Sequence, residues 1–151
     1  MESGKTVSDG AEDATFGRDY LCTLMILLLH TVIEGAIALL FLFYPDAGEL
    51  IPGLGTSEGP GFDLLLKMYG LAALLLAGLS LYAYLQRRQD DIFLFVTLVL
   101  SIYHYLMVAV QTIYNPDQRA ALLHFLLAIF LTGQYLGRRR KSWNDPQPPA
   151  N

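Results

Sequence analysis

The stretch "LLLHTVIEGAIALL" (27–40) decides the fold, because it is apolar except for a histidine, a threonine and a glutamate. It lies inside a longer segment, 20–44, in which Glu34 is the only formally charged residue. As an α-helix, a segment of this length crosses roughly 30 Å of hydrocarbon at about 1.5 Å per residue. It follows a polar tail, and no small-residue cleavage pattern comes after it, so we predict a retained membrane helix rather than a signal peptide.

Three further segments of the same kind follow. Segment 64–86 carries one formal charge, Lys67, and segments 92–114 and 120–137 carry none. The whole chain of 151 residues is 54% apolar and 16% charged, whereas about a quarter of a soluble domain is charged. We therefore predict an all-α, multi-pass integral membrane protein. Its single four-helix bundle domain would span 20–140, with helices at about 20–44, 63–86, 92–114 and 118–137, between disordered tails at 1–19 and 141–151.

The connections support this count of helices. "QRRQDD" (86–91) and "NPDQR" (115–119) are short and polar, so the last three helices are expected to be antiparallel neighbours, with Asp117 capping the last one. Segment 45–62 is rich in glycine and proline, and no regular element is expected there. A plain connector and a lid over the bundle are both open interpretations of that segment.

The distribution of lysine and arginine predicts the orientation, because these residues concentrate on the cytoplasmic side of membrane proteins. With four helices, the N-terminal tail, the 87–91 turn and the C-terminal tail share one side. That side carries most of the basic residues: Lys5, Arg18, Arg87, Arg88, Arg138, Arg139, Arg140 and Lys141. The other side has only Lys67 and Arg119. Both termini are therefore predicted to be cytoplasmic, in a host membrane that the sequence leaves open.

Polar residues inside the predicted helices form the candidate site. Counting from the cytoplasmic edge places Glu34 about 21 Å deep and His104 about 20 Å deep on another helix, with His30 at about 15 Å. Ionisable residues within membrane helices face the bundle interior. Glu34 and His104 are therefore expected to meet near the bilayer centre, with His30 as a supporting neighbour. Three more residues complete the predicted ligand or proton site: His124, Lys67 and Gln111. A small-residue face, predicted to permit close helix packing, comprises Gly70, Ala73, Ala77 and Gly78.

Several functions fit a buried carboxylate beside imidazoles. The pair could anchor the polar end of a lipid-like small molecule, pass protons or ions along a path through His124 and Lys67, or only fix the helices in register. A metal or haem site through His30 and His104 is a further alternative. It has little support because the three histidines are scattered over three helices at unequal depths, so neither a metal nor a cofactor is expected.

Other classes of function have no motif to support them. The sequence contains no nucleophile–base pattern and no phosphate-binding loop, so an enzyme is not expected, and a net charge of −4 gives no indication of nucleic-acid binding. The expected partners are the lipid bilayer, a lipid-like small molecule, and a second copy of the chain or a larger membrane complex. We therefore predict an accessory or ligand-binding membrane protein, with a proton- or ion-conducting element and a purely structural subunit as alternatives.

Two stretches, "LLFLFYPDAGELIPGLG" (39–55) and "LLLKMYGLAALLLAGLSLYAYL" (64–85), resemble small four-helix DoxX-like membrane proteins. The resemblance extends over 20–140 and is carried by a helix ending near a proline, an aromatic-glycine motif, a small residue in the second helix and a final Gly-Arg pair: Pro45, Tyr69-Gly70, Gly78 and Gly137-Arg138. It implies the fold rather than an activity. Glu34 also resembles the membrane-embedded carboxylates of related sterol- and lipid-handling proteins of the endoplasmic reticulum.

Overall fold

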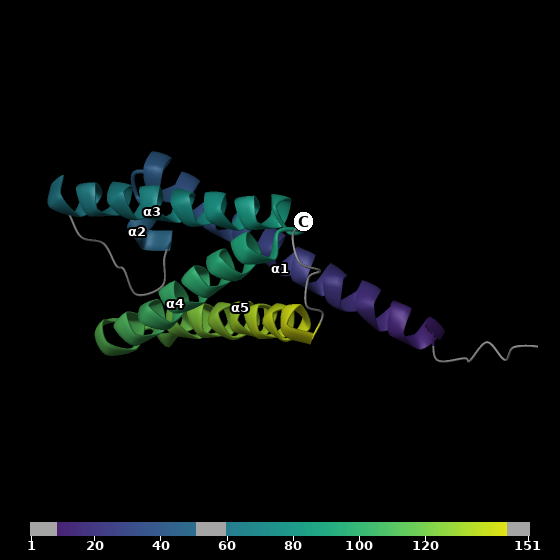
Figure 1. Cartoon of the computed structure of the whole chain (residues 1–151). Coiled ribbons are helices and arrows are strands. Elements are labelled where there is room, and N and C mark those ends of the chain that lie inside the picture. Colours follow the sequence, from purple (N-terminus) through teal and green to yellow (C-terminus); the bar gives the residue numbers. More distant parts are fainter. Residues whose placement is uncertain (1–8, 51–59, 145–151) are drawn as a thin grey trace, which may run out of the picture.

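The chain forms helices almost throughout the residues that the computed structural model describes, 9–50 and 60–144, with side chains described for 25–50 and 61–143. The elements are α1 (Asp9–Phe43), α2 (Ala47–Leu50), α3 (Pro60–Leu85), α4 (Asp90–Tyr114) and α5 (Gln118–Asn144), as Figure 1 shows. Within these two ranges there is no strand. The predicted all-α class is confirmed for the described part of the chain.

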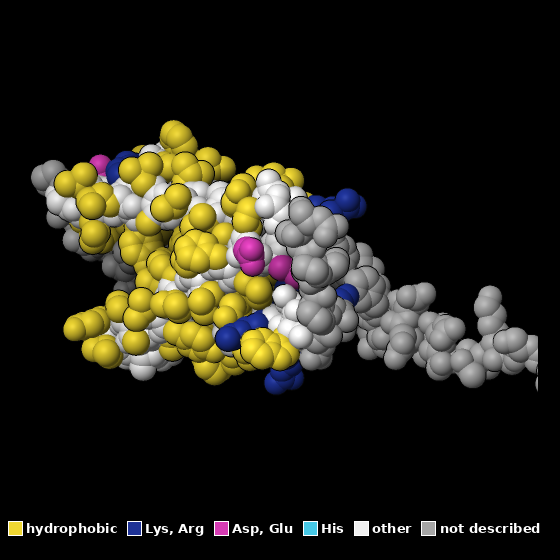
Figure 2. All heavy atoms as spheres, in the orientation of Figure 1, with side chains coloured by type: hydrophobic (Ala, Val, Ile, Leu, Met, Phe, Trp, Pro, Cys, Tyr) yellow, Lys and Arg dark blue, Asp and Glu magenta, His cyan; other side chains and the backbone are white. Residues whose placement is uncertain are grey.

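Four of these helices are long and apolar enough to cross a membrane. The qualifying segments are Met25–Phe43, Gly61–Leu85, Asp90–Tyr114 and Gln118–Trp143. Apolar side chains also cover much of the outer surface (Figure 2). Several large ones are more than half exposed, among them Val32, Leu75, Phe95 and Ile113. In water such a surface would be unfavourable, so length, composition and surface together indicate an integral membrane protein.

The helices extend further than the sequence predicted. α1 begins at Asp9, so 9–19 is helical where a disordered tail was expected, and α5 continues to Asn144 rather than ending near 137. An established helix gains one backbone hydrogen bond for each added residue and needs no apolar side chains to continue. The short helix α2 also forms where no regular element was expected, and Ala47 packs there with Phe41 and Leu66. Most of the proposed lid, 51–59, lies outside the described residues, as do 1–8 and 145–151.

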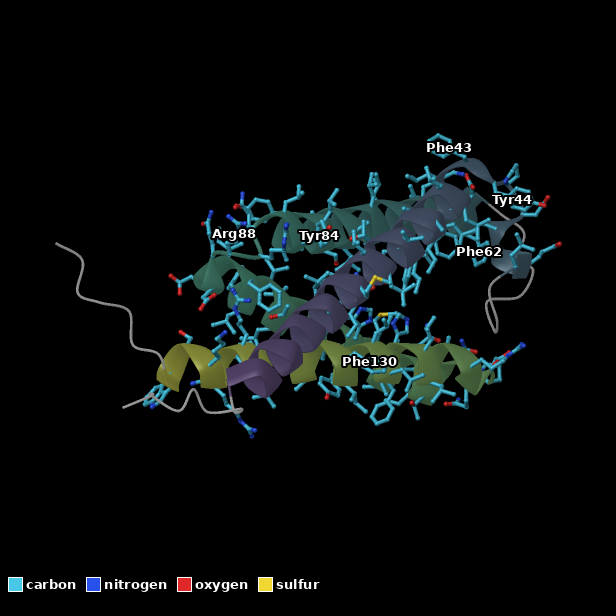
Figure 3. All side chains as sticks on the ribbon, turned by 90° about the vertical axis from the view of Figure 1, so that its right-hand side faces the viewer. Phe43, Tyr44, Phe62, Tyr84, Arg88 and Phe130 are labelled. Carbon is cyan, nitrogen blue, oxygen red and sulfur yellow. The ribbon has the colours of Figure 1, made fainter. Side chains whose placement is uncertain are left out.

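The four long helices associate as two pairs. α1 packs along α3 and α4 packs along α5, whereas contacts between the pairs are sparse and lie mainly between α3 and α4 and between α1 and α5 (Figure 1). Figure 3 shows α1 running obliquely from the end near Phe43 towards α5. Phe43, Tyr44 and Phe62 lie at the same end of the first pair as α2, and Arg88 lies at the opposite end of α3 (Figure 3). We call the boundary between α1/α3 and α4/α5 the seam.

The first pair is held by a close approach at Gly70. A Cβ atom placed there would lie 2.9 Å from Cγ of Leu42 and 3.2 Å from the backbone oxygen of Ala38. Ala73 and Ala77 are buried as well. The predicted small-residue face is thus correct for these three positions. It is wrong for Gly78, which is exposed and has no neighbouring atom near its Cβ position.

The second pair is tied at the turn between α3 and α4. Arg138 donates hydrogen bonds from Nε and Nη2 to Oδ1 of Asp90, at 2.8 and 2.6 Å, and from Nη2 to the carbonyl oxygen of Arg87 at 2.9 Å. Its guanidinium also lies 5.3 Å from the ring centroid of Phe93. The sequence indicated only that Arg138 belongs to a basic run that sets the orientation in the membrane. The structure shows that Arg138 also connects α5 to the start of α4.

The start of α5 has the predicted cap. The backbone N–H of Arg119 donates to Oδ1 of Asp117 at 3.0 Å, which satisfies one of the free donors in the first turn of the helix. The Arg119 side chain also hydrogen-bonds this carboxylate and lowers the pKa of Asp117 to about 2. The cap therefore stays charged at ordinary pH.

Candidate functional site

A row of polar side chains crosses the bundle, with one member from each long helix. Oγ of Ser80 (α3) lies 2.6 Å from Nδ1 of His30 (α1). Nε2 of His30 lies 2.7 Å from Nε2 of His104 (α4), and Nδ1 of His104 lies 2.9 Å from Nδ1 of His124 (α5). We call these four residues the histidine row. The contact between His30 and His104 crosses the seam, so the row connects the two helix pairs.

Glu34 adds a buried carboxylate next to this row. It is 4% exposed, and His30, His104 and Ser80 are fully buried. Oε1 of Glu34 lies 3.8 Å from Nε2 of His30, which is too far for a hydrogen bond. Among the residues whose side chains are described, none makes a hydrogen bond to Glu34. This carboxylate is therefore buried without a donor at hydrogen-bonding distance.

Helical periodicity explains why these residues reach the interior. Leu27, His30 and Glu34 recur at intervals of three and four, so they lie on one face of α1, and all three are buried. Thr97 and Ser101 share the face of His104 on α4, but their hydroxyls donate back to the carbonyls of Phe93 and Thr97. These hydroxyls are thus satisfied within α4, and His104 is the member of this polar face that joins the row.

The row can be fully hydrogen-bonded with every imidazole neutral. A neutral imidazole has one N–H donor and one acceptor nitrogen. In one arrangement Ser80 donates to His30, His30 donates to His104, and His104 donates to His124; in the other, each of these bonds points the opposite way. Both leave each contacting nitrogen paired. The row runs from helix to helix rather than along any one of them.

The structure brings together some of the predicted site residues and separates others. His30, Glu34, His104 and His124 come together, whereas Lys67 does not join them. Nζ of Lys67 donates to the carbonyl oxygen of Phe41 at 3.3 Å and lies 3.6 Å from Oδ1 of Asp63. Gln111 is also separate, because its Oε1 accepts from the side chain of Asn115 at the end of α4, at 2.6 Å. The described hydrogen bonds therefore do not continue the row to Lys67 or Gln111.

Two features of the row differ from what the sequence indicated. His30, interpreted as a supporting neighbour, occupies the centre, where it contacts Ser80 and His104 and lies next to Glu34. Ser80 was not identified at all. It continues the spacing of Gly70, Ala73 and Ala77 on the packing face of α3, and that periodicity was the signal that could have identified it.

The histidines also form a cluster that the argument from unequal depths did not anticipate. One ligand atom each from His30, Glu34 and His104 lie within 4.8 Å of one another. Counting residues along each helix assumes that the helices are parallel, whereas α1 runs obliquely to α5 (Figure 3). The histidines thus lie close together although they belong to three helices, and their positions permit a shared ligand.

Comparisons with protein-family models, with curated proteins and with solved structures find no match to this chain. The resemblance to DoxX-like proteins therefore stays a prediction. Because a fold by itself does not specify a function, the geometry of the polar site is the feature that bears on the function of this protein.

Proposed function

We propose that this small multi-pass membrane protein binds a ligand through the polar site formed by His30, Glu34 and His104. The observation that carries the proposal is the buried carboxylate of Glu34, which has no hydrogen-bond donor among the described side chains. Burying such a group unpaired costs free energy, particularly inside a membrane. A ligand that binds Glu34 together with the neighbouring imidazoles removes this cost.

The position of the site at the seam supports the same proposal. His30 and Glu34 belong to the first pair and His104 belongs to the second. Because contacts between the pairs are sparse, a ligand that enters along the seam disturbs less packing than one that enters within a pair. A lipid-like molecule with a polar head at Glu34 is the ligand that the sequence suggested, and this entry route suits its apolar body.

Glu34→Gln tests the proposal, because it keeps the shape of the side chain and removes its negative charge. We expect the Glu34→Gln protein, purified with its bound small molecules, to retain at least about tenfold less ligand than the wild type. This ratio is equivalent to about 1.4 kcal/mol of binding free energy. Native mass spectrometry of the detergent-solubilised protein, with lipid and elemental analysis of what it releases, measures this loss.

The matched control is Glu49→Gln, because this glutamate is exposed and belongs to α2, which contributes no member of the histidine row. It should leave the bound species unchanged. If Glu34→Gln retains the same species in the same amount as the Glu49→Gln protein, Glu34 binds no ligand and the proposal fails.

A structural role for the histidine row is the second candidate, and it is favoured by the contact between His30 and His104 across the seam. Polar contacts of this kind hold membrane helices together. Proton or ion conduction has weaker support, because the described hydrogen bonds run between helices and do not reach Lys67 or Gln111.

For the arrangement in the membrane we propose four antiparallel helices with both termini in the cytoplasm. The short connections 86–89 and 115–117 and the distribution of basic residues support this topology. Single cysteines at Glu49→Cys and Arg140→Cys, each in a Cys22→Ser background, test it with a membrane-impermeant maleimide. We expect the first to be labelled on intact cells and the second only after permeabilisation, and the reverse pattern contradicts the topology.

A further inference from the structure

We infer that the ligand is a transition-metal ion of the zinc type, bound by Nε2 of His30, Nε2 of His104 and the carboxylate of Glu34. This inference rests on the proposed function and narrows it from a ligand of any class to a metal ion. The three ligand atoms lie within 4.8 Å of one another and come from buried side chains. Zinc sites with two histidines, one glutamate and an open fourth position are an established type of coordination.

The distances suit a metal ion of this size. Zinc–nitrogen and zinc–oxygen bonds are about 2.0–2.2 Å long, which places neighbouring ligand atoms of a tetrahedral site roughly 3.3 Å apart. The observed separations are 2.7 Å between the two Nε2 atoms and 3.8 Å between Nε2 of His30 and Oε1 of Glu34. All three ligand atoms lie within 4.8 Å of one another, so the side chains must close in by up to about 1.5 Å to reach a tetrahedral arrangement. His30 and Glu34 also have the i, i+4 spacing that places two ligands on one helix face.

The outer partners of the two histidines complete the arrangement. A histidine that binds a metal through one nitrogen usually donates its other N–H to a nearby acceptor, which fixes the tautomer and the ring orientation. Here Nδ1 of His30 contacts Oγ of Ser80, and Nδ1 of His104 contacts Nδ1 of His124. With both protons on Nδ1, the two Nε2 lone pairs are available to bind the ion. Ser80 and His124 are thus positioning residues for the two imidazoles.

The chemistry of the ligands selects the class of ion. Imidazole nitrogens suit zinc, copper, iron and nickel, whereas magnesium and calcium prefer sites built from oxygen atoms. One carboxylate among three ligands offsets part of the charge of a divalent ion within the membrane. The three side chains leave a fourth coordination position for water or for a further ligand.

A titration of the purified full-length protein with Co²⁺ tests the inference, after removal of any purification tag and of bound metal. We expect saturable binding of one Co²⁺ per chain, with the intense visible absorption of a four-coordinate site, and competition by Zn²⁺. The absence of any such site in the folded wild-type protein overturns the inference without recourse to a variant.

The variants give a graded result. Glu34→Gln is expected to weaken Co²⁺ binding more than 100-fold, and Ser80→Ala about 10- to 100-fold, the usual effect of an outer partner. Glu49→Gln serves as the control and should bind as the wild type does. Equal affinity in the wild-type and Glu34→Gln proteins, with unchanged thermal unfolding, contradicts the assignment of Glu34 as a ligand.

The same preparations distinguish failure of this inference from failure of the proposed function. If an organic molecule is retained only when Glu34 is present and no metal binds, the binding site remains and the metal assignment is wrong. If neither a metal nor an organic molecule depends on Glu34, both proposals fail.

Discussion

Replacing Gly70 with leucine is expected to break the close packing of α1 on α3 and to lower the free energy of unfolding by about 3 kcal/mol. A Cβ at this position would lie 2.9 Å from Cγ of Leu42 and 3.1 Å from Cβ of Phe41. The backbone oxygen of Ala38, at 3.2 Å, has no rotamer through which to move away. The two helices must therefore separate, and thermal unfolding in detergent, followed by circular dichroism, measures the loss.

Gly78→Leu is the matched control on the same helix. Gly78 has no neighbouring atom near its Cβ position, and leucine favours a helix over glycine by somewhat less than 1 kcal/mol. We expect this variant to unfold at the wild-type temperature or slightly above it. Equal destabilisation by the two substitutions would show that the loss at Gly70 does not come from its close packing against α1, because Gly78 has no such contact.

Replacing His104 with leucine is expected to have the second large effect. His104 is the middle ring between His30 and His124, so its loss leaves one nitrogen on each of them without its partner inside the membrane. A buried polar atom left unpaired costs about 1–3 kcal/mol. The unfolding measurement used for Gly70 also gives this cost.

A double-mutant cycle separates the cost of an orphaned nitrogen from the cost of lost packing. We expect His30→Leu combined with His104→Leu to cost less than the sum of the single variants, with a coupling of about 0.5–2 kcal/mol. His124→Leu should cost less than His104→Leu, because His124 lies at the end of the row and is only half-buried. If His104→Leu leaves the free energy of unfolding unchanged, the row does not hold the helices together, and ligand binding remains as its role.

The sequence was sufficient to predict the positions of the membrane helices. Their position depends on the length of apolar segments, and the bilayer imposes that length on every chain that crosses it. The ends of the helices were less well predicted. Residues 9–19 are polar, and their composition does not reveal that α1 starts at Asp9, because the start depends on extension of an existing helix rather than on burial.

The sequence identified the histidines and Glu34 of the candidate site, but it also included Lys67 and Gln111, which lie apart from them, and it did not predict how the residues connect. Glu34 and His104 could be identified because ionisable residues are rare in membrane helices. That His30 contacts His104, and that His124 joins them, depends on the tilt of α1 and on the pairing of the helices, which the number of residues along each helix does not specify. Ser80 was missed because serine is common in membrane helices, and only its alignment with Gly70, Ala73 and Ala77 distinguishes it.

The division into two helix pairs bears on how the site arises during synthesis. α1 and α3 leave the ribosome first, and they are able to pack on each other before α4 and α5 exist. At that stage His30 and Ser80 can already contact each other, but His104, the partner of His30 across the seam, has not yet been synthesised. The three side chains of the polar site meet only after α4 has entered the membrane. A chain whose insertion has not passed α4 therefore lacks the complete polar site.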